Sequence, residues 1–265
     1  MLDLGSVVLL LALLLAASAV GHFVRSRLPE RHRSRDSVEL VQVTINLLVT
    51  FTAIVLGLLT TSVKAGFDSA YNARGIYAAE FAQLDEYLRQ YGPETDKIRE
   101  QLRAYVAAVI ASTWPDEKPP AGVKYPDVSH MPMTGESRAL GDIINDVGRE
   151  INSLEPNDLP RQRLLSECVQ QYSDLVHARW RVIEGARGSI SPPFYWVLVL
   201  WLVILFASLG LTAPANPATI LVITLSAISI TVAVFVIVDL DLPYGGLFSI
   251  PSTSMRNALA DMMRS

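Results

Sequence analysis

The sequence is poor in cysteine and in charged residues. It has one cysteine, Cys168, among 265 residues, so no second cysteine is present to form an internal disulfide. Cys168 falls among apolar residues at helical spacing, which favours a buried structural thiol over a nucleophile. Charged residues make up 18% of the chain and hydrophobic residues 51%, whereas soluble domains carry about 25% charged residues. This balance indicates a membrane protein rather than a large soluble core.

The sequence also lacks the residue clusters on which catalytic and metal sites depend. Its histidines are His22, His32, His130 and His177. No two of them are three or four residues apart, and metal sites need grouped ligands. No Walker loop or G-x-S-x-G elbow is present, and no basic stretch is typical of nucleic-acid binding. We therefore expect no enzymatic activity, no cofactor and no metal.

Four apolar stretches are long enough to cross a bilayer, which needs about 20 residues of helix. They cover residues 6–24, 38–63, 194–211 and 218–238. The first stretch has its basic residues after it rather than before it, which is the wrong order for a secretory signal, so we interpret it as a retained span. The short link over residues 212–217 predicts a tight antiparallel hairpin of the last two spans.

The region between the second and third stretches is charged, periodic and nearly free of strand signals. Apolar residues at steps of three and four predict that the second span continues as one long helix, with Arg74 as the single break in its apolar face and Gly92-Pro93 at its end. Further helices are expected from Glu94, over residues 136–154, and after a cap at Asp158. Their apolar faces would pack as a bundle or meet neighbouring subunits.

These segments predict an all-α integral membrane protein with four transmembrane helices in two pairs and a helical-bundle domain inserted between spans two and three. Residues 1–63 are expected to hold spans one and two with an Arg-rich loop, and residues 64–190 the extramembranous helical domain. Residues 191–239 are expected to form the transmembrane hairpin, and residues 240–265 a C-terminal tail.

The loop between the first two spans is rich in arginine. The residues are Arg25, Arg27, Arg31, Arg33 and Arg35. By the positive-inside rule this loop is cytoplasmic, which places the helical domain and both termini outside. Positive residues also flank the domain side of the spans, so the side on which the domain lies stays open.

Polar and small residues follow one side of the second span. They are Gln42, Asn46, Thr50, Gly57 and Thr60. In an apolar helix such a stripe must face protein or water rather than lipid. Two interpretations remain, namely packing between helices and a permeation path lined by the second span, with Phe67 narrowing its exit. No span has a charged residue or histidine in its middle, which disfavours a proton-coupled or voltage-driven transporter.

Two short segments resemble the bacterial bestrophin-like membrane proteins, a family distantly similar to bestrophin channels. The segment that leaves the second span contains Phe67, Tyr71 and Arg74. The segment that follows the fourth span contains Asp241, Pro243, Tyr244 and Gly245. The plan of two pairs of spans around a helical insert is also similar, over nearly the whole chain.

This resemblance implies a multi-pass protein of the bacterial cytoplasmic membrane that forms a symmetric homo-oligomer, with a pentamer as the candidate assembly. It implies a central path for small ions that is lined by the second span, and anions are the ions expected to pass. It also implies a cytoplasmic helical domain, which conflicts with the arginine-rich loop. The expected partners are lipid and small ions, without nucleic acid. The alternative function is a membrane-anchored scaffold or sensor that binds a protein partner without permeation.

Overall fold

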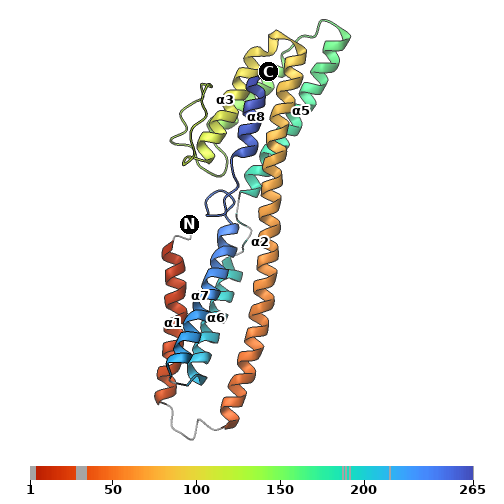
Figure 1. Ribbon diagram of the computed structural model, residues 1–265. Coiled ribbons are helices and arrows are strands. Elements are labelled where there is room, and N and C mark those ends of the chain that lie inside the picture. Colours follow the sequence, from red (N-terminus) through yellow and green to blue (C-terminus); the bar gives the residue numbers. More distant parts are fainter. Residues whose placement is uncertain are drawn as a thin grey trace. The chain divides into compact units, whose positions relative to one another are not determined.

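The computed structural model describes residues 4–27, 35–186, 188, 190, 192–214 and 216–264. Over these residues the chain is helical and contains no strand (Figure 1). It divides into two compact units, with boundaries after Ala65, after Gly188 and after Asp241. The all-α class expected from the sequence is therefore confirmed.

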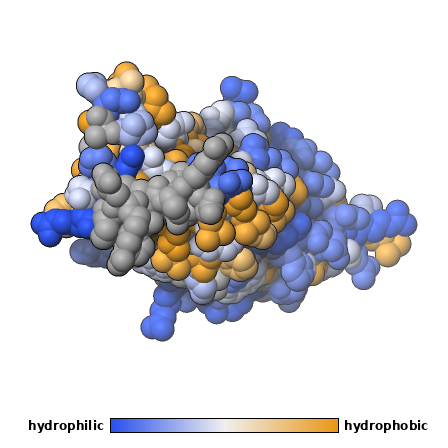
Figure 2. Space-filling model, turned by 90° about the horizontal axis from the view of Figure 1, so that it is seen from below, coloured by the Kyte–Doolittle hydropathy of each residue, from blue (hydrophilic) through white to orange (hydrophobic). Residues whose placement is uncertain are grey.

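The first unit contains helices that are long and apolar enough to cross a membrane. They are α1 (Leu4–Arg27), α6 (Pro192–Thr212) and α7 (Pro217–Leu240), together with the first part of α2 (Arg35–Tyr91). Each matches one of the four apolar stretches seen in the sequence. Figure 2 shows the molecule from the side at which α1 stops and α2 starts. Apolar residues, drawn in orange, form patches on the surface seen in this view. Such an exposed apolar surface suits contact with lipid.

The helices α1 and α6 approach each other closely at two glycines. A Cβ atom added at Gly21 would collide with the backbone carbonyl of Ala207, and one added at Gly210 would collide with that of Ser18. Arg25 donates hydrogen bonds to the carbonyls of Thr212, at 3.3 Å, and Ala213, where α6 ends. A cation is favourable at a helix C-terminus, so Arg25 stabilises this end of α6.

The other arginines of this loop contribute less to the described structure. The guanidinium of Arg27 lies 4.7 Å from the centre of the Phe23 ring. Arg31, Arg33 and the side chain of Arg35 lie outside the described residues. Neither side of the membrane is indicated by these contacts, so the topology expected from the loop stays a prediction.

The second unit is a helical bundle. The rest of α2 packs with α3 (Asp96–Thr113), α4 (Arg138–Asn152), α5 (Leu159–Gly185) and α8 (Thr253–Arg264), and the turn η2 (Pro93–Thr95) joins α2 to α3. Gly92 has a φ angle of 136°, which glycine adopts readily. The side chain of Asp158 accepts a hydrogen bond of 2.7 Å from the Arg161 N–H. The helix end at Gly92-Pro93 and the cap at Asp158 are both confirmed.

The apolar face predicted for α2 forms part of the core of the second unit. Tyr77, Phe81, Leu84 and Leu88 are buried on it. The thiol of Cys168 is also fully buried, which confirms its structural placement.

The region expected to be a tail contains α8, a helix that the sequence analysis did not predict. Its Met255, Leu259 and Met262 are buried in the same core. The indole N–H of Trp114 donates a 2.8 Å hydrogen bond to the carbonyl of Ile250, just before α8. This helix therefore completes the bundle rather than trailing from it.

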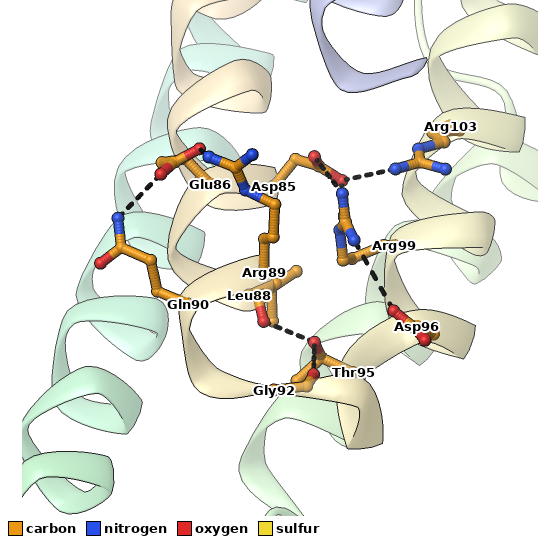
Figure 3. A network of polar contacts seen from close by, with 10 residues as sticks. All are labelled: Asp85, Glu86, Leu88, Arg89, Gln90, Gly92, Thr95, Asp96, Arg99 and Arg103. Atoms are coloured by element: carbon orange, nitrogen blue, oxygen red, sulfur yellow. Dashed lines mark hydrogen bonds and ion pairs between the residues drawn. The ribbon is translucent and has the colours of Figure 1, made fainter. Parts of the chain in front are cut away.

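A polar network joins α2 to α3 near their junction (Figure 3). The buried carboxylate of Asp85 accepts two hydrogen bonds of 3.0 Å from Arg99. A terminal nitrogen of Arg103 lies 3.8 Å from the same carboxylate. The hydroxyl of Thr95 donates to the Leu88 carbonyl. Together these contacts fix the turn between the two helices.

Candidate functional site

The polar stripe of α2 lies on the surface of the single chain. All five residues of the stripe are exposed: Gln42, Asn46, Thr50, Gly57 and Thr60. On the same helix, Ile45, Thr52 and Val63 are buried. Because successive residues turn by about 100° around a helix, the stripe is centred roughly a third of a turn from these buried residues. The rest of the first unit therefore leaves the stripe uncovered.

The threonines of the stripe meet their hydrogen-bonding needs within the helix. The Thr50 hydroxyl donates to the Asn46 carbonyl at 2.9 Å, and the Thr60 hydroxyl donates to the Leu56 carbonyl at 2.7 Å. A Cβ atom added at Gly57 would find open space within 4 Å. Thr50, Gly57 and Thr60 thus present a narrow, weakly polar surface.

The amides of Gln42 and Asn46 do not meet their needs in this way. The Gln42 side-chain nitrogen donates to the Asn46 side-chain oxygen at 3.3 Å. No further hydrogen bond joins these two side chains to the described residues. An amide group carries two donors and an oxygen that accepts. One donor and the oxygen of Gln42, and both donors of Asn46, therefore have no hydrogen-bond partner among the described residues. Lipid tails offer no partner, so water or another chain must supply one.

Of the four candidate spans, α2 is the one that its own chain covers least. In the apolar stretch of α2, 11% of the residues are buried inside the chain, whereas 22% to 33% are buried in the apolar stretches of the other three helices. A large uncovered face that carries amides is what a helix at a subunit interface or a pore would present.

Phe67 belongs to the part of α2 that lies in the second unit. It is half-buried and packs against the core of the second unit. Its predicted role in narrowing an ion path stays a prediction.

The two family-like segments meet inside the second unit. Arg74 donates a 3.2 Å hydrogen bond from Nε to the Tyr244 hydroxyl, and its guanidinium lies 4.7 Å from the centre of the Tyr244 ring. The guanidinium also lies 5.0 Å from the Trp114 ring centre. Arg74 and Tyr244 are both buried although 170 positions separate them.

A short turn holds Tyr244 in place. The Ile250 N–H donates to the Pro243 carbonyl at 2.8 Å, and the Gly245 N–H donates to the Leu242 carbonyl at 3.3 Å. Of the remaining residues of the two segments, Tyr71 is exposed, and Asp241 accepts a 3.1 Å hydrogen bond from the Ile190 N–H within the first unit. The structure thus brings together Arg74 and the turn around Tyr244, but not Tyr71.

Comparison with known families agrees with this geometry. The family model of the bestrophin-like domain matches residues 12–255. The chain belongs to the bestrophin-like family. The resemblance drawn from the two segments is confirmed, and the match contains both segments.

Solved structures share the bestrophin-like fold. A variant of a bacterial bestrophin homologue from Klebsiella pneumoniae is 14% identical, with 98% of each chain covered and a TM-score of 0.71. A second variant of a bestrophin homologue from the same organism is 16% identical, covers 97% of this chain and 98% of the other, and has a TM-score of 0.68. At these identities the likeness shows the fold alone. A comparison with curated proteins found no match.

Sequence reasoning missed the roles of Trp114 and Arg179. Trp114 directly follows α3 and is buried beside Arg74. Arg179 is buried on α5, eleven residues after Cys168 and four after Leu175, on the same apolar face. That spacing was a signal for its burial.

Proposed function

We propose that this bestrophin-like chain forms a homo-oligomeric, channel-like protein of the bacterial cytoplasmic membrane. Small ions pass passively along α2, and anions are the ions that we expect to pass. Residues 1–63 and 191–239 supply two pairs of spans, and residues 64–190 form the domain inserted between them. The observation that carries the proposal is the exposed stripe on α2, whose Gln42 and Asn46 amides lack sufficient partners among the described residues.

The chemistry of the stripe suits passive movement of an anion. In a ring of subunits, copies of α2 would turn these stripes toward a shared axis. The amide N–H groups of Gln42 and Asn46 would replace water around an anion, while Gly57 leaves room beside the helix. The middle of the span carries no titratable side chain, so no proton has to move with the ion.

Two threonines on α2 provide a matched test. Thr50 lies on the stripe, whereas Thr44 is exposed about 120° away around the helix. Each hydroxyl donates to the carbonyl four residues earlier. In the proposed path the Thr50 hydroxyl turns from the Asn46 carbonyl to donate to the passing anion. We therefore expect Thr50→Val to lower anion efflux from liposomes by about fivefold, as the loss of roughly 1 kcal/mol at the barrier predicts. Thr44→Val serves as the control and should leave efflux unchanged.

Equal efflux from the two valine variants would contradict a path along the stripe. A uniform oligomer that carries no chloride or potassium at all would favour the scaffold function, in which the stripe only packs against other helices.

A further inference from the structure

The second unit contains a small cavity that the proposed ion path does not use. It has a volume of about 60 Å³ and lies among α2, α3, α5 and the turn that holds Tyr244. Exposed residues of the loop before α4, from Pro132 to Gly135, line one part of it. A cavity needs only about 10–15 Å³ to hold one water molecule, so this one has room for several waters or for one anion of a few heavy atoms.

Two buried arginines line this cavity. Arg74 is 4% exposed and Arg179 is 6% exposed. None of the described residues that line the cavity is acidic. Glu136, which is about half-exposed, approaches Arg179 at 3.5 Å. Among the described residues Arg74 has no carboxylate partner; its contacts are the Tyr244 hydroxyl and two aromatic rings. A buried charge without a counter-ion is unfavourable.

The hydroxyl groups of the cavity add hydrogen-bond donors. The Tyr77 and Tyr105 hydroxyls share a 2.8 Å hydrogen bond, and Arg179 donates to Tyr105 at 3.1 Å. One of the two phenolic protons forms the shared bond, so the other is left to donate elsewhere. Burial is the main cause that raises the pKa of Tyr77 well above its ordinary value, and the charge of the neighbouring Tyr105 is the second. The Tyr77 proton is therefore retained at neutral pH. The cavity therefore presents two cationic side chains and a neutral phenol donor, and none of its described lining residues carries a carboxylate.

We propose that this cavity binds a small planar oxyanion, of carboxylate or carbonate shape, between Arg74 and Arg179. The flat guanidinium fork matches the two oxygens of such an anion. The rings of Trp114 and Tyr244 hold the Arg74 guanidinium in place before the anion arrives. The site does not depend on ion permeation, so its test does not require a channel.

Calorimetric titration of the full chain in detergent tests this proposal. Sodium nitrate and sodium acetate are the probes, in sodium chloride at constant ionic strength, so that only an anion preferred over chloride gives a signal. We expect saturable binding of one probe ion per chain. Arg74→Met should weaken binding about tenfold to a hundredfold, since a hydrogen bond to a charged group is lost.

The control variant is Arg161→Met. Arg161 is partly exposed, already pairs with Glu94 at 2.7 Å and lies outside the cavity, so binding should be unchanged. If Arg74→Met does not fold, Arg74→Lys replaces it, since it keeps the charge but loses the fork, and it should also weaken binding. Absence of saturable binding by the wild-type chain, which would leave only water in the cavity, overturns the proposal. Binding that survives the Arg74 substitution also overturns it.

Discussion

Asp85 illustrates how strongly single residues hold the second unit together. Asp85 is 2% exposed, and its carboxylate accepts two hydrogen bonds from Arg99, which is 8% exposed. Asp85→Asn keeps the shape but leaves the buried Arg99 charge with only the exposed carboxylate of Asp96, 3.6 Å away, as a counter-ion, which costs up to about 3–5 kcal/mol. We expect Tm to fall by roughly 6–20 °C, measured by thermal unfolding in detergent.

An exposed ion pair provides the control for this substitution. Asp146 pairs with Arg149 on the surface of α4, and such pairs contribute about 0–1 kcal/mol. Asp146→Asn should therefore leave Tm nearly unchanged. A similar fall in Tm in both variants would show that the buried Asp85–Arg99 pair contributes no more to stability than an exposed pair.

Cys168 gives a second prediction at the scale of one residue. Burial raises the pKa of its thiol to about 11, so only about one thiol in a thousand is ionised at pH 8. Maleimide should label the folded protein very slowly at pH 8 and label it fully after denaturation. Because the pKa is higher in the folded state, the thiol's contribution to stability is full below its ordinary pKa and is lost as pH rises toward 11. Rapid labelling of the folded chain would mean that α5 is not packed as described.

The partners of single residues were the least predictable feature. The sequence marked Arg74 as a break in an apolar face, and the face itself is buried as predicted. Its contact with Tyr244 joins positions 170 residues apart, and no local spacing reports such a contact. Periodicity predicts which side of a helix is buried, whereas a partner depends on how the helices are packed.

At the scale of helices, the crossing of α1 and α6 depends on glycine. Gly210 lies against the Ser18 carbonyl, with no room for a Cβ atom. Gly210→Leu should separate the two helices and destabilise the first unit by roughly 3 kcal/mol or more, since overpacking against backbone is not relieved by a change of rotamer. The yield of monodisperse protein after extraction and its Tm measure this effect.

Gly5→Leu is the matched control, because a Cβ atom at Gly5 in α1 meets nothing within 4 Å. It should behave as wild type. Equal tolerance of leucine at both positions would contradict the close crossing.

The existence of helices was predictable, and their ends nearly so. Hydropathy located α1, α6 and α7, and Gly92-Pro93 and Asp158 marked helix ends that the structure confirms. The helix α8 was missed because it has 12 residues and follows a turn. Its Met255, Leu259 and Met262 are spaced by four and three residues, which is the same signal that identified the longer helices.

At the scale of the whole molecule, the candidate ion path rests on the assembly of several chains. One chain leaves the stripe of α2 exposed, so the sequence could predict which residues need a partner but not what that partner is. The side of the membrane on which the helical domain lies stays a prediction, since the arginine-rich loop and the family likeness point in opposite directions.

Ion flux through Asn46→Leu protein tests the central claim most directly. Purified wild-type and variant chains are placed in liposomes, with chloride and potassium efflux measured separately and the oligomer checked for uniform size. The proposed path predicts anion efflux from the wild type and a changed rate in the variant, because the Asn46 donors are removed. A stable, uniform variant whose efflux equals that of the wild type would contradict a path along α2.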